Sequence, residues 1–172
     1  MCSSDLSDLA NVLGNLLNRT LNMAKKYLDG KIQDTSFDDS LAAELRSAVE
    51  ALPQLTKDAL QTYQIHKALA AAWDVLNLAN TYVEKTAPFK LAKDPANAPQ
   101  VAAIMRNLAE TILHVSIMIS PVVPKAARNI QKQLGWESDR GMTLADLHWG
   151  LLRPGHQLGI GVPLFPRVEV EG

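Results

Sequence analysis

The chain has 172 residues and a formal net charge of −1, and it is 47% apolar but only 5% aromatic. This length favours one domain with a sizeable core. A charge near zero excludes a strongly basic nucleic-acid coat, so any contact with RNA has to be a local patch, and DNA is not expected as a partner. The single cysteine, Cys2, excludes an internal disulfide and a cysteine-based zinc site, and it favours a reducing, cytoplasmic compartment.

A membrane partner is not expected either. No apolar stretch approaches the roughly 20 uncharged residues that span a bilayer. The N-terminus has no basic region followed by an apolar run, which would indicate a secretory signal.

The first predicted element is a long helix. Ser3 or Ser4 caps it, leucines recur at spacings of three and four residues, and Gly30 ends it. A second helix begins after the cap region 36–39. We expect Pro53 to break that helix, with a shorter one resuming at Gln54.

Three more helices are predicted, each bounded by proline or glycine. Their ranges are Gln64 to about Thr86, about Pro99 to Ile119, and Pro124 to Gly135. Residues 90–98 are expected to form a loop, and residues 142–152 only a short helical turn.

The expected fold is therefore all-α, a bundle of about five helices with an irregular apolar C-terminal tail. We expect residues 1–152 to form the bundle and residues 153–172 to form the tail. The tail is too apolar for a solvated peptide, so we expect it to pack on the bundle or on a part of the protein absent from this chain, and to order mainly by the latter contact.

Asn15 and Arg19 are the first candidate binding residues. Positions four residues apart lie on one face of a helix, so the amide and the guanidinium can converge on one planar polar target. Together they offer donors and an acceptor suited to the edges of an unpaired base. The alternative is that Asn15 satisfies a buried backbone group and Arg19 is an ordinary solvated helix residue.

Phe89 is the third candidate. The Pro88-Phe89 pair ends the third predicted helix and leaves an aromatic ring at its end, where a base can stack. Lys85, Lys90 and Lys93 surround it with positive charge. The alternative is a ring folded into the core.

The sequence gives no sign of a metal, a cofactor or a catalytic centre. The four histidines are scattered and show no paired carboxylate or second ligand four residues away, so neither a metal site nor a catalytic triad is predicted. No glycine-rich phosphate loop precedes a helix.

Four stretches carry a family resemblance along nearly the whole chain. They are Leu13-Gly14-Asn15-Leu16-Leu17-Asn18-Arg19; Leu78-Ala79-Asn80-Thr81-Tyr82 with Ala87-Pro88-Phe89-Lys90-Leu91-Ala92-Lys93; Ser120-Pro121-Val122-Val123-Pro124-Lys125-Ala126-Ala127; and Leu164-Phe165-Pro166-Arg167-Val168-Glu169. In this order and spacing the chain resembles the anticodon-binding helical-bundle domain of methionyl-tRNA synthetases, which are class I aminoacyl-tRNA synthetases.

The resemblance implies that Asn15 and Arg19 hydrogen-bond anticodon bases and that Phe89 stacks on the first of them. It implies recognition of the CAU anticodon of tRNA(Met). The family commonly has tryptophan where this chain has Phe89, which offers less ring area and no indole donor. The family's nucleotide-binding signatures are missing, so the resemblance implies a non-catalytic chain without cofactors, whose partners are the tRNA(Met) anticodon loop and a catalytic domain that binds ATP and methionine. The remaining alternative is a structural or protein-interaction bundle.

Overall fold

The computed structural model describes residues 3–35, 39–137 and 144–162, and for residues 3–10 and 145 it describes the backbone only. The helices are α1 (Ser3–Leu28), α2 (Ser40–Gln61), α3 (Ile65–Thr86), the single-turn α4 (Pro88–Leu91), α5 (Ala98–Ile119) and α6 (Pro124–Gln133); 3₁₀ turns η1 and η2 cover Pro95–Asn97 and Leu144–Asp146. Within the described ranges no β-strand forms, only an isolated bridge between Lys31 and Gln157. The all-α prediction is confirmed.

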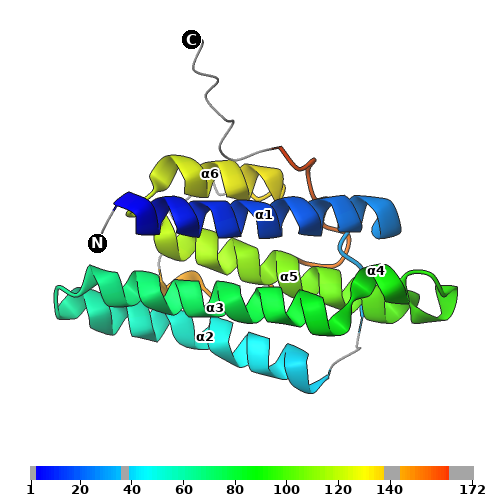
Figure 1. Ribbon diagram of the computed structural model, residues 1–172, viewed down its shortest axis with the longest axis horizontal. Helices are drawn as coiled ribbons and strands as arrows, with labels where there is room; N and C mark the ends of the chain where they lie inside the picture. Colours follow the sequence, from blue (N-terminus) through cyan, green and yellow to red (C-terminus); the bar gives the residue numbers. More distant parts are fainter. Residues whose placement is uncertain (1–2, 36–38, 138–143, 163–172) are drawn as a thin grey trace, which may run out of the picture.

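Helix α5 is the centre of the bundle. It packs on α1, α2, α3, α4 and α6, and Figure 1 shows α1 and α6 on one side of it and α2 and α3 on the other. Every residue from Leu108 to Ile119 is buried. A helix covered on all sides is mostly apolar all round, and the buried polar residues of α5, such as Glu110 and His114, form hydrogen bonds.

This central position also explains why α5 resembles a membrane span. The segment Pro95–Ile119 is long and apolar enough to cross a bilayer, with a mean hydropathy of 1.3, but 89% of that window is buried inside the bundle. Among the described residues it is the one segment that meets this criterion. Its apolar residues form the centre of the hydrophobic core, which the other helices complete.

Glycines and caps set most helix ends where the sequence predicts them. The backbone turns left-handed at Asp29 (φ 52°) and Gly30 (φ 74°) after α1, and at Gly135 (φ 68°) after α6. The carboxylate of Asp39 accepts a 2.7 Å bond from the N–H of Ala42 and caps α2. The predicted ends of α1, α3, α5 and α6 are confirmed to within about two residues.

The predicted break at Pro53 is wrong. Helix α2 continues through Pro53 to Gln61 as one ribbon (Figure 1). Proline lacks an N–H, so the carbonyl of Val49 loses its helical partner. Val49 and Leu52 before the proline and Thr56 after it are buried on one face against α3 and α5, and this packing outweighs the lost bond.

The predicted loop 90–98 is more ordered than expected. Ala87 adopts a left-handed conformation (φ 42°), which ends α3 and lets Pro88 start α4 directly. The carboxylate of Asp94 then accepts a bond from the N–H of Ala96 and caps η1. These two short elements fix the direction in which the Pro88-Phe89 turn points.

The segment after α6 is tied to α5 by Glu110. This carboxylate is 1% exposed and accepts the backbone N–H groups of Gly150, Leu151 and Leu152 at 2.8, 2.6 and 2.9 Å. The predicted helical turn is realised as η2, while residues 142 and 143 lie outside the described ranges.

The described part of the tail is held by the bundle itself. The N–H of Gly155 donates to the carbonyl of Ile32, that of Leu158 to Gly30, and that of Gly159 to Gln133. These bonds show that residues 155–159 contact the bundle, so packing on an absent domain is not their only contact, and residues 163–172 lie outside the described ranges. Whether the tail orders mainly on another domain stays a prediction. The domain boundary at residue 152 stays a prediction.

Candidate nucleic-acid interface

Asn15 and Arg19 lie on the solvent face of α1, and both are exposed. Leu16 and Leu17, which lie between them in sequence, are 0 and 1% exposed. Their burial orients the helix so that Asn15 and Arg19 face solvent. Neither side chain forms a hydrogen bond or an ion pair with another described residue. The alternative of an Asn15 side chain serving a buried backbone group does not fit this exposure.

The tail covers one flank of α1 and leaves the other open. A β-carbon built on Gly161 would come within 2.7 Å of Asn18 Oδ1, and Asn18 Oδ1 already accepts a 3.1 Å bond from Asn22. Successive helix residues are about 100° apart, so Arg19 points about 100° away from Asn18. Arg19 thus points away from the flank that meets the tail, whereas Asn15 lies about 60° from Asn18.

Phe89 lies in α4 just beyond the end of α3. Pro88 before it is buried, whereas Phe89 is 48% exposed. Tyr82, one helical turn before the end of α3, is buried, and its hydroxyl accepts a 3.1 Å bond from Asn107 of α5. This anchoring holds the turn on the bundle and leaves about half of the Phe89 side chain in solvent, which does not fit the alternative of a ring in the core.

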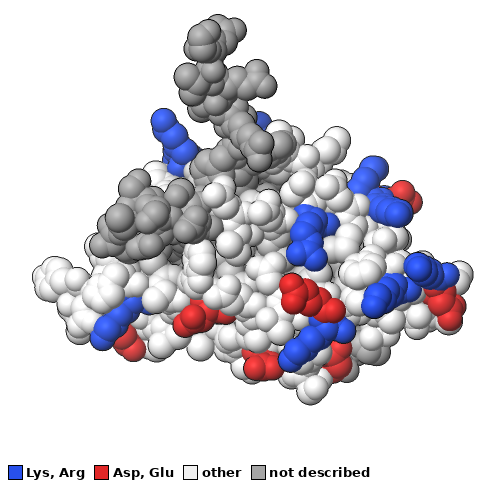
Figure 2. All heavy atoms as spheres, viewed as in Figure 1, with Lys and Arg blue, Asp and Glu red and all other residues white. Residues whose placement is uncertain are grey.

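Asn15, Arg19 and Phe89, called the predicted contact residues below, come from two helices that both pack on α5. Figure 2 shows lysine and arginine atoms over the C-terminal half of α1 and over the region of α4 on one face, with acidic atoms between them. No continuous basic field covers that face. The local character of any RNA contact, expected from the near-neutral charge, fits this view.

The remaining polar residues have structural roles. Asn80 Nδ2 donates to the carbonyl of Leu76, one turn earlier in α3. The statement that no histidine has a carboxylate four residues away is wrong: His114 Nδ1 lies 3.8 Å from Glu110 Oε1, and both side chains are buried. The sequence signal for this pair is a glutamate and a histidine four residues apart in a mostly apolar helix.

The ring nitrogens of His114 are engaged by backbone carbonyl groups. The described residues contain no group of three or more histidine, cysteine, aspartate or glutamate side chains that could hold an ion. Both ring nitrogens of His114 face carbonyl oxygens, of Glu110 at 2.9 Å and of His148 at 3.2 Å. The ring is thereby used to hold the segment before Gly150 on α5.

Residues 30–172 match the family model described as the anticodon binding domain of methionyl tRNA ligase. The chain belongs to this anticodon-binding domain family. Membership covers α2 to α6 and the tail, and it includes the turn that carries Phe89.

Curated relatives support the same family over nearly the whole chain. The methionine–tRNA ligase of Fusobacterium nucleatum is 36% identical over 167 residues, and that of Caldanaerobacter subterraneus is 37% identical over 165 residues. Each alignment covers 96% of this chain but only 26% of the relative. The chain thus spans about a quarter of the length of these ligases and corresponds to their non-catalytic, anticodon-binding part.

Solved structures give the same result for the fold. The apo methionyl-tRNA synthetase of Mycobacterium tuberculosis superimposes with a TM-score of 0.85 at 30% identity, over 95% of this chain and 33% of that one. The same enzyme in complex with methionyl-adenylate gives 0.84 at 31% identity. The helical bundle of this domain is therefore similar in fold to the corresponding part of the M. tuberculosis enzyme.

Proposed function

We propose that this domain recognises the CAU anticodon of tRNA(Met) for a cytoplasmic methionine–tRNA ligase. The observation that carries the proposal is the exposure of Asn15, Arg19 and Phe89, which family membership alone does not require. These three side chains suit the recognition of unpaired bases, and they are exposed on α1 and α4, which both pack on α5.

Each predicted contact residue supplies a different interaction. The planar guanidinium of Arg19 presents a rigid fork of donors, and the Asn15 amide adds a donor and an acceptor. These groups suit the edges of bases splayed out of a loop. Stacking on an aromatic ring such as Phe89 is worth roughly 1–3 kcal/mol per base.

The chain itself contributes binding and no chemical step. In the complete ligase the catalytic domain is the partner that binds ATP and methionine, and the present domain holds the anticodon loop. Discrimination among tRNAs then arises from the difference in binding free energy between the correct and the incorrect anticodon.

The test is a titration of the chain with two anticodon stem-loops, one with CAU and one with a changed first base. We expect tighter binding of the CAU stem-loop. Arg19→Ala should lower that affinity by about 1–3 kcal/mol, because a base-reading fork is lost, and should leave the thermal midpoint nearly unchanged.

Arg128→Ala is the matched control, because Arg128 is an exposed arginine on α6. Its removal should change neither the affinity nor the midpoint. If Arg19→Ala unfolds several degrees earlier and yet binds as the wild type does, Arg19 is a structural residue.

A second candidate function is a protein-docking bundle. It is favoured by Ile160 and Val162, which are 79 and 56% exposed at the end of the described tail. Equal affinity of the wild-type chain for both stem-loops would reject anticodon recognition and leave this candidate.

A further inference from the structure

A polar stripe on α1 extends well beyond the two predicted contact residues. Asn15, Arg19, Asn22 and Lys26 follow one another at spacings of four, three and four residues, and all four are exposed. At about 100° per residue they fall within a sector of about 60°, and at 1.5 Å per residue the stripe is about 16 Å long. Lys26 therefore stands on the same face as Asn15 and Arg19.

This part of α1 carries positive charge that forms no ion pair with another described residue. From Leu9 to Leu28 the helix has Arg19, Lys25 and Lys26 and no acidic residue. The two ion pairs found among the described residues, Arg46–Glu50 and His114–Glu110, involve none of these cations.

Lys26 differs from its neighbour Lys25 in direction. The two lie about 100° apart around the helix. The Lys25 chain turns toward Gly30, where a β-carbon would lie 3.8 Å from Lys25 Cδ, and so toward the bridge to the tail. The ammonium of Lys26 instead lies 5.4 Å from the centre of the Tyr27 ring.

The turn that carries Phe89 adds two more cations. Lys90 and Lys93 are exposed, and neither takes part in an ion pair with a described residue. On the face in Figure 2, cations lie over the C-terminal half of α1 and over the region of α4. Exposed cations thus lie close in sequence both to Arg19 on α1 and to Phe89 on α4.

We propose that Lys26, Lys90 and Lys93 bind phosphates of the single-stranded RNA that the predicted contact residues read. The inference rests on the proposed function. It assigns to these lysines the part of the RNA affinity that does not depend on the base sequence. Contacts to phosphate position a nucleic acid and supply salt-dependent affinity, whereas contacts to bases supply the choice of sequence. An ammonium on a flexible stem is suited to the first task and not to the second.

The experiment measures affinity for the CAU stem-loop and for the stem-loop with a changed first base over a range of salt concentrations. Lys26→Gln and the double variant Lys90→Gln/Lys93→Gln keep polar side chains and remove charge. Each lost lysine should weaken binding of both stem-loops by the same factor, roughly threefold to tenfold at low salt, and should reduce the slope of log K against log salt by about 0.7. The ratio between the two stem-loops should stay as in the wild type.

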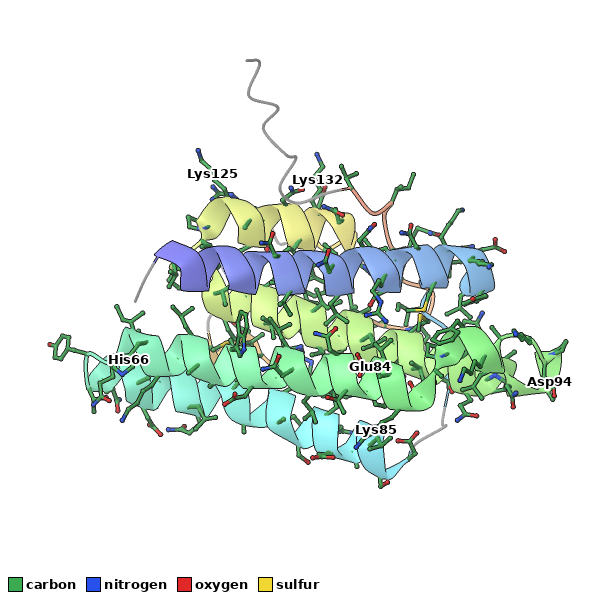
Figure 3. The ribbon with its side chains drawn as sticks, viewed as in Figure 1. His66, Glu84, Lys85, Asp94, Lys125 and Lys132 are labelled. Carbon is green, nitrogen blue, oxygen red and sulfur yellow. The ribbon has the colours of Figure 1, made fainter. Side chains whose placement is uncertain are left out.

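Lys125→Gln is the matched control, with the same change of charge on α6. Figure 3 shows Lys125 projecting from α6 away from the bundle. This variant should keep the wild-type affinity and slope.

Three results would overturn the proposal: an unchanged slope in Lys26→Gln, an effect of Lys125→Gln as large as that of Lys26→Gln, or a loss confined to the CAU stem-loop. The proposed function fails by a different result, equal binding of both stem-loops by the wild type. If the wild type prefers the CAU stem-loop and Lys26→Gln binds both stem-loops as the wild type does, the phosphate-binding proposal is rejected and the proposed function is retained.

Discussion

At the scale of single residues, the environment of some side chains can be predicted from the sequence, as for Asn15 and Arg19, and that of others cannot, as for Glu110. Helical periodicity places Asn15 and Arg19 on the polar face of their helix, so their exposure follows from a local rule. For Phe89 the sequence leaves both a ring in solvent and a ring in the core open, and the packing of the Pro88 turn decides between them. Glu110 is different. Its partners lie about 40 residues away along the chain, at Gly150 to Leu152, and no local rule connects them.

Glu110→Ala should lower the free energy of unfolding by about 3 kcal/mol or more, because three backbone N–H groups lose their acceptor and His114 loses its carboxylate. Glu110→Gln should cost less, since it keeps the shape and one acceptor. Urea denaturation measures both. Glu50→Ala, which removes an exposed carboxylate paired only with Arg46, should change stability by less than about 1 kcal/mol. Equal losses for Glu50→Ala and Glu110→Ala would contradict the role of Glu110 as an anchor.

Phe89 gives a residue-scale prediction on binding. Phe89→Ala should weaken CAU stem-loop binding by about 1–3 kcal/mol, and Phe89→Trp should hold or strengthen it, because stacking grows with the area of the ring face. Tyr63→Ala is the control, since Tyr63 is an aromatic residue 94% exposed at the α2–α3 turn. Equal affinity of the wild type and both Phe89 variants would remove this ring from the interface.

At the scale of elements, the sequence predicts helices well where local signals agree and fails where packing overrides one of them. Glycine, proline and cap residues locate the ends of α1, α3, α5 and α6. In α2, Pro53 does remove a helical hydrogen bond, but the burial of Val49, Leu52 and Thr56 on one face stabilises the helix by more than this loss. The sequence does not predict the order of the α4–η1 segment. The two elements that Ala87 and Asp94 begin are only four and three residues long, which is too short for a periodic pattern.

Pro53→Ala should therefore raise the free energy of unfolding, by about 2 kcal/mol. A proline inside a helix costs about 3 kcal/mol, and part of the gain from its removal is offset by the greater freedom of the unfolded chain. Pro154→Ala, in an exposed position outside any helix, should show only the second effect and lower stability slightly. A marked loss of stability in Pro53→Ala would mean that the packing of the ring matters more than the missing hydrogen bond.

At the scale of the whole molecule, the described tail connects two elements that are far apart in the sequence. Its backbone bonds run to Gly30 and Ile32 after α1 and to Gln133 at the end of α6, and Gln133 Oε1 also accepts the N–H of Val162 at 2.8 Å. The Nε2 of His156 lies 2.7 Å from the carbonyl of Leu134. Sequence indicates that this segment is too apolar for solvent, but its partners are set by the tertiary arrangement of α1 and α6, which no spacing in the sequence encodes.

We expect amide hydrogen exchange in the isolated chain to follow this bonding residue by residue. The N–H groups of Leu158 and Gly159 should exchange slowly, because each donates to a bundle carbonyl, whereas that of Ile160, which is 79% exposed, should exchange fast. Gly159→Ala should speed exchange at Leu158 and Val162, since its β-carbon would lie 2.8 Å from the Gln133 carbonyl oxygen and the backbone has to move. The central amides of α3 serve as the internal control and should keep their wild-type rates. Fast exchange throughout residues 155–162 in the wild type would show that the bundle does not hold the tail, and would support the expectation that the tail orders on another domain.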